Sequence, residues 1–138
     1  MAKINVEKAE GKLGILVVGV GGAVASTFIA GTLMARKGLG IPVGSITQLS
    51  TIKLSDGSTP KIKDVLPIAK LDDIVFGGWD IFEDNVYKAA THAAVLSQKD
   101  LDSVKDELEA IKPMKAAFDN KYVTRLHGTW VKKADTKW

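Results

Sequence analysis

Apolar residues and glycines alternate in blocks along the first part of this chain. The run from Leu13 to Val18 is apolar throughout and partly β-branched, which is typical of a strand buried on both faces of a parallel sheet. Glycines occupy three of the next four positions, and Ala23 to Lys37 then has the character of a helix that Gly38 ends. The pattern predicts a strand, a glycine turn and a helix in direct succession. We expect one apolar side of this helix to consist of Val24, Thr27, Phe28, Gly31 and Met34 or Ala35.

A second unit of this kind begins at Asp73. Residues 73–80 form another short apolar run that ends in two glycines, a tryptophan and an acid, and they predict a second buried strand. A helix is expected over about 83–96. Ser97 with Asp100 resembles a capping box that opens a further helix to residue 112. No clear period follows, so we expect the chain to end before the third strand that a nucleotide-binding half requires. The apolar stripe expected for the last helix is Leu101, Val104, Leu108 and Ile111.

The segment between the two units, residues 39–72, has no clear period. Its apolar residues stand among Ser, Thr and Gln, and residues 55–58 (Ser-Asp-Gly-Ser) are a turn signal. We expect extended pieces and loops here, and we interpret the segment as an insertion between the first helix and the second strand.

The composition argues against several classes of function. The chain has 138 residues, of which 46% are apolar and 25% charged, as expected for one globular domain with a core. Its 19 basic and 16 acidic side chains give a net charge of +3, too small and dispersed an excess to indicate a nucleic-acid partner. The chain has no cysteine and only two, widely separated histidines, so we expect no disulfide and no metal site.

One uncharged stretch, residues 13–35, is long enough to span a bilayer. Glycines at its middle and interspersed Ser and Thr residues argue against a membrane helix. Glu7 and Glu10 precede it, unlike the short basic segment that opens a secretory signal. We therefore expect no membrane association and divide the stretch into the strand and helix described above.

The glycine turn, residues 19–22, is the most informative local feature. Glycines permit a sharp turn and a close approach of the backbone to a diphosphate. The free N–H groups at the start of the next helix would then bind the negatively charged phosphates. The alternative is an ordinary tight turn in an α/β protein. A G-x-G-x-x-G/A fingerprint would place its third small residue at Val24, which departs from it.

Asp80 is the second candidate binding residue. An acid at the end of the second strand of a dinucleotide-binding fold accepts hydrogen bonds from the adenosine ribose. The usual spacing is about 20 residues after the glycines, so residues 39–72 must be an insertion if Asp80 has this role. The alternative is that Asp80 caps the helix that follows. No pairing of a nucleophile with a base is recognisable, so we assign no catalytic residue.

Several motifs together resemble the myo-inositol-1-phosphate synthase family. They are Leu16–Thr27 around the glycine turn, Gly44–Leu49 (Gly-Ser-Ile-Thr-Gln-Leu), Phe76–Ile81 (Phe-Gly-Gly-Trp-Asp-Ile) followed by Asn85 and Tyr87, and Leu108–Pro113. The resemblance runs from about Gly14 onward, and the Gly-Trp-Asp-Ile string is more specific than the glycine turn. This string also disfavours an ordinary NAD(P)-dependent dehydrogenase.

The resemblance implies a cytoplasmic, homotetrameric isomerase of inositol and phospholipid biosynthesis that uses bound NAD. Such enzymes convert D-glucose 6-phosphate to 1D-myo-inositol 3-phosphate by oxidation at C5, enolisation, an intramolecular aldol step and reduction. It also implies an insertion before Asp80. The cofactor contacts that it implies are Gly19, Val20, Gly21, Gly22, Ala23, Val24 and Asp80. Eukaryotic members carry Asn-Asn where this chain has Ala23-Val24.

Members of the family are several times longer than this chain. Their catalytic lysines and tetramerisation sheet belong to later sequence. We therefore expect residues 1–138 to form the first portion of an α/β, Rossmann-type parallel sheet with helices, truncated before completion. Such a piece would supply part of the NAD site and no catalysis. The alternative is a stand-alone nucleotide-binding or structural module.

Overall fold

Parallel strands form the frame of the computed structural model, which describes residues 7, 10–119 and 123–133. The order in the sheet is β1-β2-β3-β4. Strand β1 (Leu13–Val18) pairs with β2 (Ile74–Asp80) along its whole length, from Leu13 opposite Ile74 to Val18 opposite Trp79. Both strands expected from the sequence are confirmed, the second of them starting one residue late because Asp73 belongs to a 3-10 turn.

Two further strands correct the expectation that the chain ends before a third one. Strand β3 (Met114–Phe118) lies parallel to β2, and β4 (Val131–Lys133) lies parallel to β3. Long-range contacts hold them. The backbone N–H of Trp130 donates to the carbonyl of Ile81 at 2.8 Å, and its indole N–H donates to the carbonyl of Pro113 at 3.2 Å. Such contacts leave no periodic signal in a short strand, so the sequence pattern missed them.

Helix α1 (Ala23–Arg36) follows the glycine turn and ends one residue before the expected Lys37, which caps it. The expected apolar side is wrong, because Val24 is 86% and Phe28 49% exposed. Almost every residue of this helix is uncharged, so its own pattern does not select a face. Contact with the sheet and the other helices selects it. The buried residues are Ala25, Ser26, Ile29, Ala30 and Leu33.

Three short helices replace the two expected after β2, namely α4 (Val86–Ala93), α5 (Gln98–Asp102) and α6 (Lys105–Ala110). Ser97 caps α5 as expected, its side chain accepting from the backbone N–H of Asp100. The single helix expected to residue 112 is interrupted at Ser103, whose hydroxyl donates to the carbonyl of Asp100 at 2.6 Å. This bond gives the carbonyl of Asp100 a side-chain partner in place of the backbone N–H that a continuing helix would supply.

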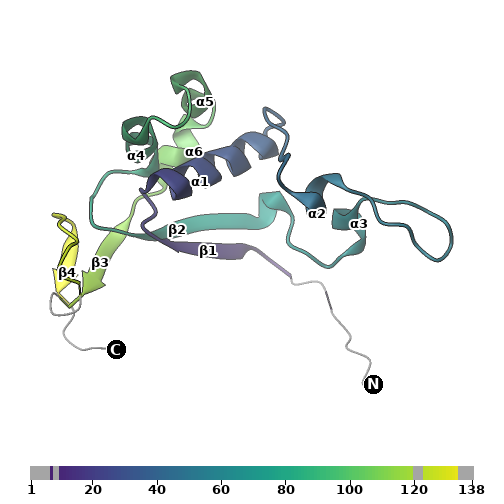
Figure 1. Cartoon of the computed structure of the whole chain (residues 1–138), viewed down its shortest axis with the longest axis horizontal. Helices are drawn as coiled ribbons and strands as arrows, with labels where there is room; N and C mark the ends of the chain where they lie inside the picture. Colours follow the sequence, from purple (N-terminus) through teal and green to yellow (C-terminus); the bar gives the residue numbers. More distant parts are fainter. Residues whose placement is uncertain (1–6, 8–9, 120–122, 134–138) are drawn as a thin grey trace.

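The hydrophobic core lies between the sheet and these helices on one face (Figure 1). The last expected stripe is confirmed at three positions, since Leu101, Val104 and Leu108 are at most 1% exposed, and Ile111 packs against the core. Val17 and Phe76 contact the core from β1 and β2. The other buried members of the cluster are Val20, Ile29, Ala30, Leu33, Val86 and Ala90.

The opposite face of the sheet, called here the open face, has no helix over it in the described part of the chain (Figure 1). Leu16 is 62%, Val18 85% and Val75 48% exposed on it. The expectation that β1 is buried on both faces is therefore wrong at Leu16 and Val18, and Val75 of β2 is exposed as well. Strand β1 is also an edge of the sheet. Among the described residues, its apolar side chains are therefore less covered than its sequence pattern predicts.

Between α1 and β2 the chain extends to one side of the sheet (Figure 1). Besides the expected turn and loops, it contains α2 (Ile46–Leu49), α3 (Ile62–Val65), the 3-10 turn η1 (Leu71–Asp73) and an antiparallel bridge between Thr51 and Lys61. Arg36 ties its end to α1, because the guanidinium donates to the carbonyls of Leu71 and Ile74. The segment leaves and returns without interrupting the sheet.

Candidate cofactor site

The glycine turn joins β1 to α1 and is tied to the end of β2. The N–H groups of Gly19 and Val20 both donate to the carbonyl of Trp79, at 2.7 and 3.1 Å. Gly22 N–H donates to the carbonyl of Gly19 at 2.9 Å. Gly19 has φ of +81°, a left-handed conformation that only glycine adopts without strain. The turn is therefore a defined structure and not a flexible link.

Gly21 brings the turn against Asp80 and α4. Its N–H donates to Oδ2 of Asp80 at 2.8 Å. A Cβ at Gly21 would lie 3.1 Å from that oxygen and 3.3 Å from Cβ of Ala89, closer than side chains normally pack. The glycine pattern predicts that this space receives a diphosphate. The structure adds that glycine is also needed for the protein's own close packing.

The N-terminus of α1 is open to solvent. Gly22 is its N-cap and offers no side-chain hydrogen bond, and Ala23 and Val24 are exposed. The first N–H groups of a helix have no partner within the helix, and together with the helix dipole they attract anions. At α1 these groups belong to residues 23–25, because Ser26 N–H already bonds the carbonyl of Gly22. This end of α1 can receive a phosphate through its backbone.

The position of the third small residue of the fingerprint, Val24, is exposed in the structure. Val24 points into solvent, whereas Ala25 is 9% and Ser26 1% exposed. The role of the third small residue is close packing of helix against strand. Val24 lies on the exposed side of α1, whose first buried residue is Ala25, so the departure at Val24 does not disturb the packing of the helix.

Asp80 lies at the end of β2 and is 9% exposed. Oδ2 accepts from Gly21 N–H, and Oδ1 accepts from Phe82 N–H at 3.1 Å. The alternative that Asp80 caps the next helix is wrong, because Asn85 is the N-cap of α4 and accepts from Lys88 N–H at 2.9 Å. A carboxylate has about four acceptor positions, so Asp80 retains capacity for further donors.

The remaining turn residue, Val20, has a fully buried side chain within the core cluster. Any contact it made with a ligand would therefore come from its backbone. The sequence-predicted residues thus lie together: the turn, the start of α1 and the end of β2 form one continuous surface. Ala25 and Ala89 also shape this surface, and they were missed because alanine carries no distinctive sequence signal.

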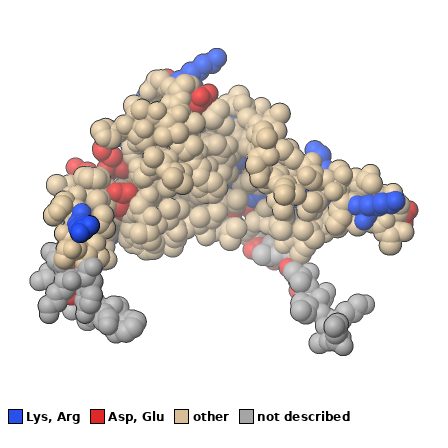
Figure 2. Space-filling model, viewed as in Figure 1, with Lys and Arg blue, Asp and Glu red and all other residues tan. Residues whose placement is uncertain are grey.

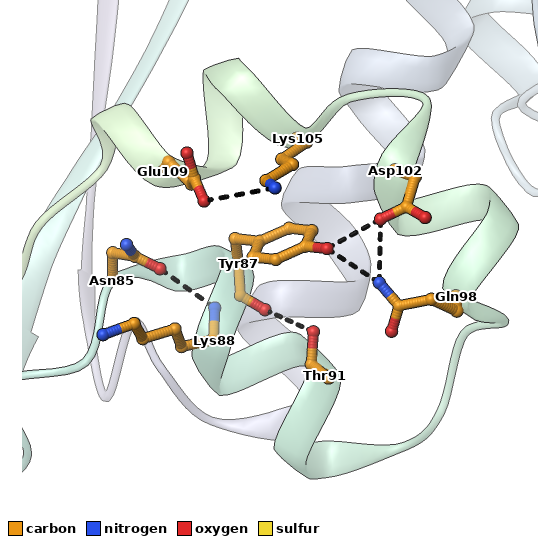
Figure 3. A network of polar contacts seen from close by, with 8 residues as sticks. All are labelled: Asn85, Tyr87, Lys88, Thr91, Gln98, Asp102, Lys105 and Glu109. Carbon is orange, nitrogen blue, oxygen red and sulfur yellow. Dashed lines mark hydrogen bonds and ion pairs between the residues drawn. The ribbon is translucent and has the colours of Figure 1, made fainter.

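A second polar cluster joins α4 to α5 and α6 (Figure 3). The hydroxyl of Tyr87 donates to Asp102 at 2.6 Å and accepts from the amide of Gln98 at 2.7 Å. The bond to Asp102 raises the pKa of Tyr87 and lowers the pKa of the carboxyl. Lys105 lies over the Tyr87 ring, with Nζ 5.2 Å from the ring centre, and pairs with Glu109. These contacts connect helices and are exposed, so we interpret them as structural.

Charged side chains are dispersed over the face shown in Figure 2, with basic groups at several separated points and acidic groups between them. Among the described residues, no His, Cys, Asp or Glu side chains gather in threes where a metal ion could be held. No helix within those ranges is both long and apolar enough to cross a membrane.

The fold and the site define a class of protein. A parallel sheet with one layer of helices, a glycine turn from the first strand to the first helix, and an acid at the end of the second strand characterise the Rossmann-type nucleotide-binding unit. The described strands and helices form part of such a domain.

Comparison with known sequences identifies the family. The model of the myo-inositol-1-phosphate synthase family, an NAD-binding domain, matches residues 13–138, and the chain belongs to this family. The chain is 61% identical over 136 residues to inositol-3-phosphate synthase 1 of Bacteroides thetaiotaomicron, covering 99% of this chain and 32% of that protein. It is 32% identical over 132 residues to inositol-3-phosphate synthase isozyme 1 of Arabidopsis thaliana, covering 86% and 26%.

A solved structure supports the fold. The crystal structure of inositol-3-phosphate synthase from Caenorhabditis elegans superposes with a TM-score of 0.68 at 24% identity, over 88% of this chain and 28% of that one. The resemblance drawn from the motifs is confirmed. The chain spans only 26 to 32% of the length of the two curated relatives above.

Proposed function

We propose that residues 1–138 provide the first part of the NAD site of an inositol-3-phosphate synthase. The observation that carries the proposal is the match to the family over residues 13–138, combined with the open N-terminus of α1 beside Asp80. The enzyme would convert D-glucose 6-phosphate to 1D-myo-inositol 3-phosphate. NAD, when bound, supplies the acceptor and then the donor of one hydride, so the reaction has no net redox change.

The residues present fit the diphosphate and adenosine ribose of NAD. The free N–H groups of Ala23, Val24 and Ala25 would hold the diphosphate, aided by the dipole of α1. The remaining acceptor capacity of Asp80 would bind ribose hydroxyls, and its negative charge would oppose the 2′-phosphate of NADP. Within the turn, Gly19 and Gly21 permit the conformation, and Val20 anchors it in the core.

Recognition at the start of α1 would rely on backbone groups. Ala23 and Val24 carry no polar side-chain atom, in contrast to the Asn-Asn pair that the resemblance assigns to eukaryotic members. Because both side chains are exposed and short, they leave the N–H groups accessible. We propose that this chain binds the cofactor at this point without side-chain hydrogen bonds.

Catalysis would need polypeptide beyond the portion that this chain matches. The chain covers 32% of the Bacteroides relative, and the resemblance places the lysines that stabilise the enolate in later sequence. We propose a cytoplasmic homotetramer for the complete enzyme, with a role in inositol and phospholipid biosynthesis. The 138-residue chain by itself would not turn over glucose 6-phosphate.

The test uses the complete polypeptide that contains residues 1–138. We expect it to bind NAD more tightly than NADP and to form inositol phosphate from glucose 6-phosphate. Gly21→Val should weaken NAD binding by at least about tenfold, since the side chain would displace Asp80 and the turn. Gly77→Val is the matched control, because a Cβ there meets only the end of Leu16 at 3.4 Å. Binding of NAD without turnover would favour the alternative of a nucleotide-binding module without catalysis, and failure to bind NAD would contradict the proposal.

A further inference from the structure

One hydrogen bond joins the two parts of the fold that the candidate site uses, the glycine turn and the end of β2. Asp80 Oδ2 accepts from Gly21 N–H at 2.8 Å across 59 positions of sequence, and Oδ1 accepts from Phe82 N–H. Asp80 is 9% exposed, so water competes little for these bonds. Bonds from N–H groups to an ionised acceptor are stronger than those between neutral groups.

The bond to Gly21 differs from the others in the turn. Gly19 and Val20 donate to the carbonyl of Trp79, and Gly22 donates to the carbonyl of Gly19. Those three bonds are between backbone groups and depend on no side chain. Gly21 N–H alone among the four turn residues bonds a side chain, so one substitution at Asp80 can release it.

We propose that Asp80 is a positioning residue for diphosphate binding, in addition to the ribose contact under the proposed function, on which this inference rests. By holding Gly21 N–H, the carboxylate fixes the turn and orients the N-terminus of α1 toward the diphosphate. Gly21 cannot itself donate to a phosphate while it bonds Asp80, so the first N–H groups of α1 carry that contact.

The positioning role and a role limited to the ribose predict opposite results for a ligand without ribose. Asp80 places a negative charge against the turn that would receive inorganic pyrophosphate. If the carboxylate contacts only the ribose, its removal relieves charge repulsion and pyrophosphate binds as well or better. If the carboxylate holds the turn, its removal weakens pyrophosphate binding in spite of the relieved repulsion. The sign of the change therefore separates the two roles.

The experiment compares pyrophosphate and adenosine binding by calorimetry in the complete polypeptide that contains residues 1–138. We expect Asp80→Ala to weaken pyrophosphate binding by about tenfold, the scale of one hydrogen bond to a charged group. Asp80→Asn should restore it, because the amide oxygen can accept from Gly21 N–H without the charge. Both variants should weaken adenosine binding. Asp84→Ala, which removes an exposed acid four positions after Asp80 in the sequence, is the control and should not weaken pyrophosphate binding.

Hydrogen exchange of the Gly21 amide tests the bond without any substitution. In the cofactor-free wild type this amide should exchange slowly, because it is bonded to a nearly buried carboxylate, and fast exchange would contradict the inference. Unchanged or tighter pyrophosphate binding in Asp80→Ala, with NAD still bound by the wild type, would also overturn it and leave the proposed function intact. Failure of the wild type to bind NAD would overturn both.

Discussion

The two faces of the sheet differ in how far this chain covers them. On the covered face, α1 and the three helices after β2 bury a core in which Ile29, Val86 and Leu108 are fully inaccessible. On the open face, Leu16 and Val18 of β1 remain mostly exposed. Both faces of β1 are nevertheless apolar in sequence, as in a central strand of a parallel sheet.

The difference shows that an apolar pattern reports which surfaces a strand can bury, while the neighbouring elements decide which surfaces are buried. The candidate site is supported from the covered face. Val20 of the turn packs in the core, and Ala89 of α4 lies next to Gly21. Substitutions on the two faces should therefore differ in their effect on stability, even when the chemical change is the same.

The largest difference in unfolding free energy between the two faces is expected for substitutions at two adjacent glycines of β2. A Cβ at Gly78 would overlap the backbone of Val17, which cannot move without opening the pairing of β1 with β2. Gly77 alternates to the open face, where a Cβ would meet only the end of Leu16. Gly78→Ala should cost about 3 kcal/mol or more of unfolding free energy, and Gly77→Ala less than about 1 kcal/mol. Urea unfolding followed by circular dichroism measures both, and equal costs would contradict the assigned contacts.

A second pair compares identical truncations. Leu101 of α5 is 1% exposed, and Leu16 of β1 is 62% exposed on the open face. Leu101→Ala should lower the free energy of unfolding by about 2 to 5 kcal/mol, because it leaves a cavity in the core. Leu16→Ala should cost less than about 1 kcal/mol in the 138-residue chain, since little surface is buried there. If Leu16→Ala costs as much as Leu101→Ala in this chain, the open face is covered and the comparison fails.

The smallest effect concerns an ion pair at the rim of the covered face. Lys37 Nζ lies 2.6 Å from Glu107 and joins the end of α1 to α6. The hydrogen bond from Lys37 lowers the pKa of Glu107 below its ordinary value of 4.5. A lowered folded-state pKa stabilises the fold above the unfolded-state value, and this contribution is lost as pH falls through the folded-state value.

Glu107→Gln should therefore lower the stability at neutral pH by less than about 1 kcal/mol, because both partners are partly exposed. The difference from the wild type should shrink as pH falls below about 4.5. Thermal unfolding at a series of pH values measures this dependence. Lys37→Met removes the partner of Glu107 and should weaken the same loss of stability at acid pH. If Glu107→Gln still differs from the wild type in stability at low pH, the ion pair is not the cause of the difference.

The first strand, the glycine turn and β2 could be predicted from sequence because their signals are local. An uncharged run bounded by glycines has few other structures, and Ser97 carries its capping signal within three residues of Asp100. Strands β3 and β4 could not be predicted, since Trp130 holds them through bonds to Ile81 and Pro113. The face of α1 was also missed, because an evenly apolar helix takes its orientation from its neighbours.

For the candidate site, the residue types could be predicted and their mutual contacts could not. The sequence pointed to Gly21 and Asp80 separately, through the turn pattern and the strand end. The bond between them crosses 59 positions and follows only from the parallel pairing of β1 with β2. The position of Ala25 in the packing likewise depends on how α1 lies on the sheet.

We propose that this turn, the start of α1 and Asp80 form the diphosphate and ribose end of an NAD site. A crystal structure of the complete polypeptide that contains residues 1–138, grown with NAD, tests it most directly. We expect the diphosphate at the N–H groups of Ala23–Ala25 and a ribose hydroxyl within hydrogen-bond distance of Asp80, with the bond from Gly21 retained. NAD bound elsewhere, or a turn that loses the bond to Asp80 when NAD binds, would contradict this assignment.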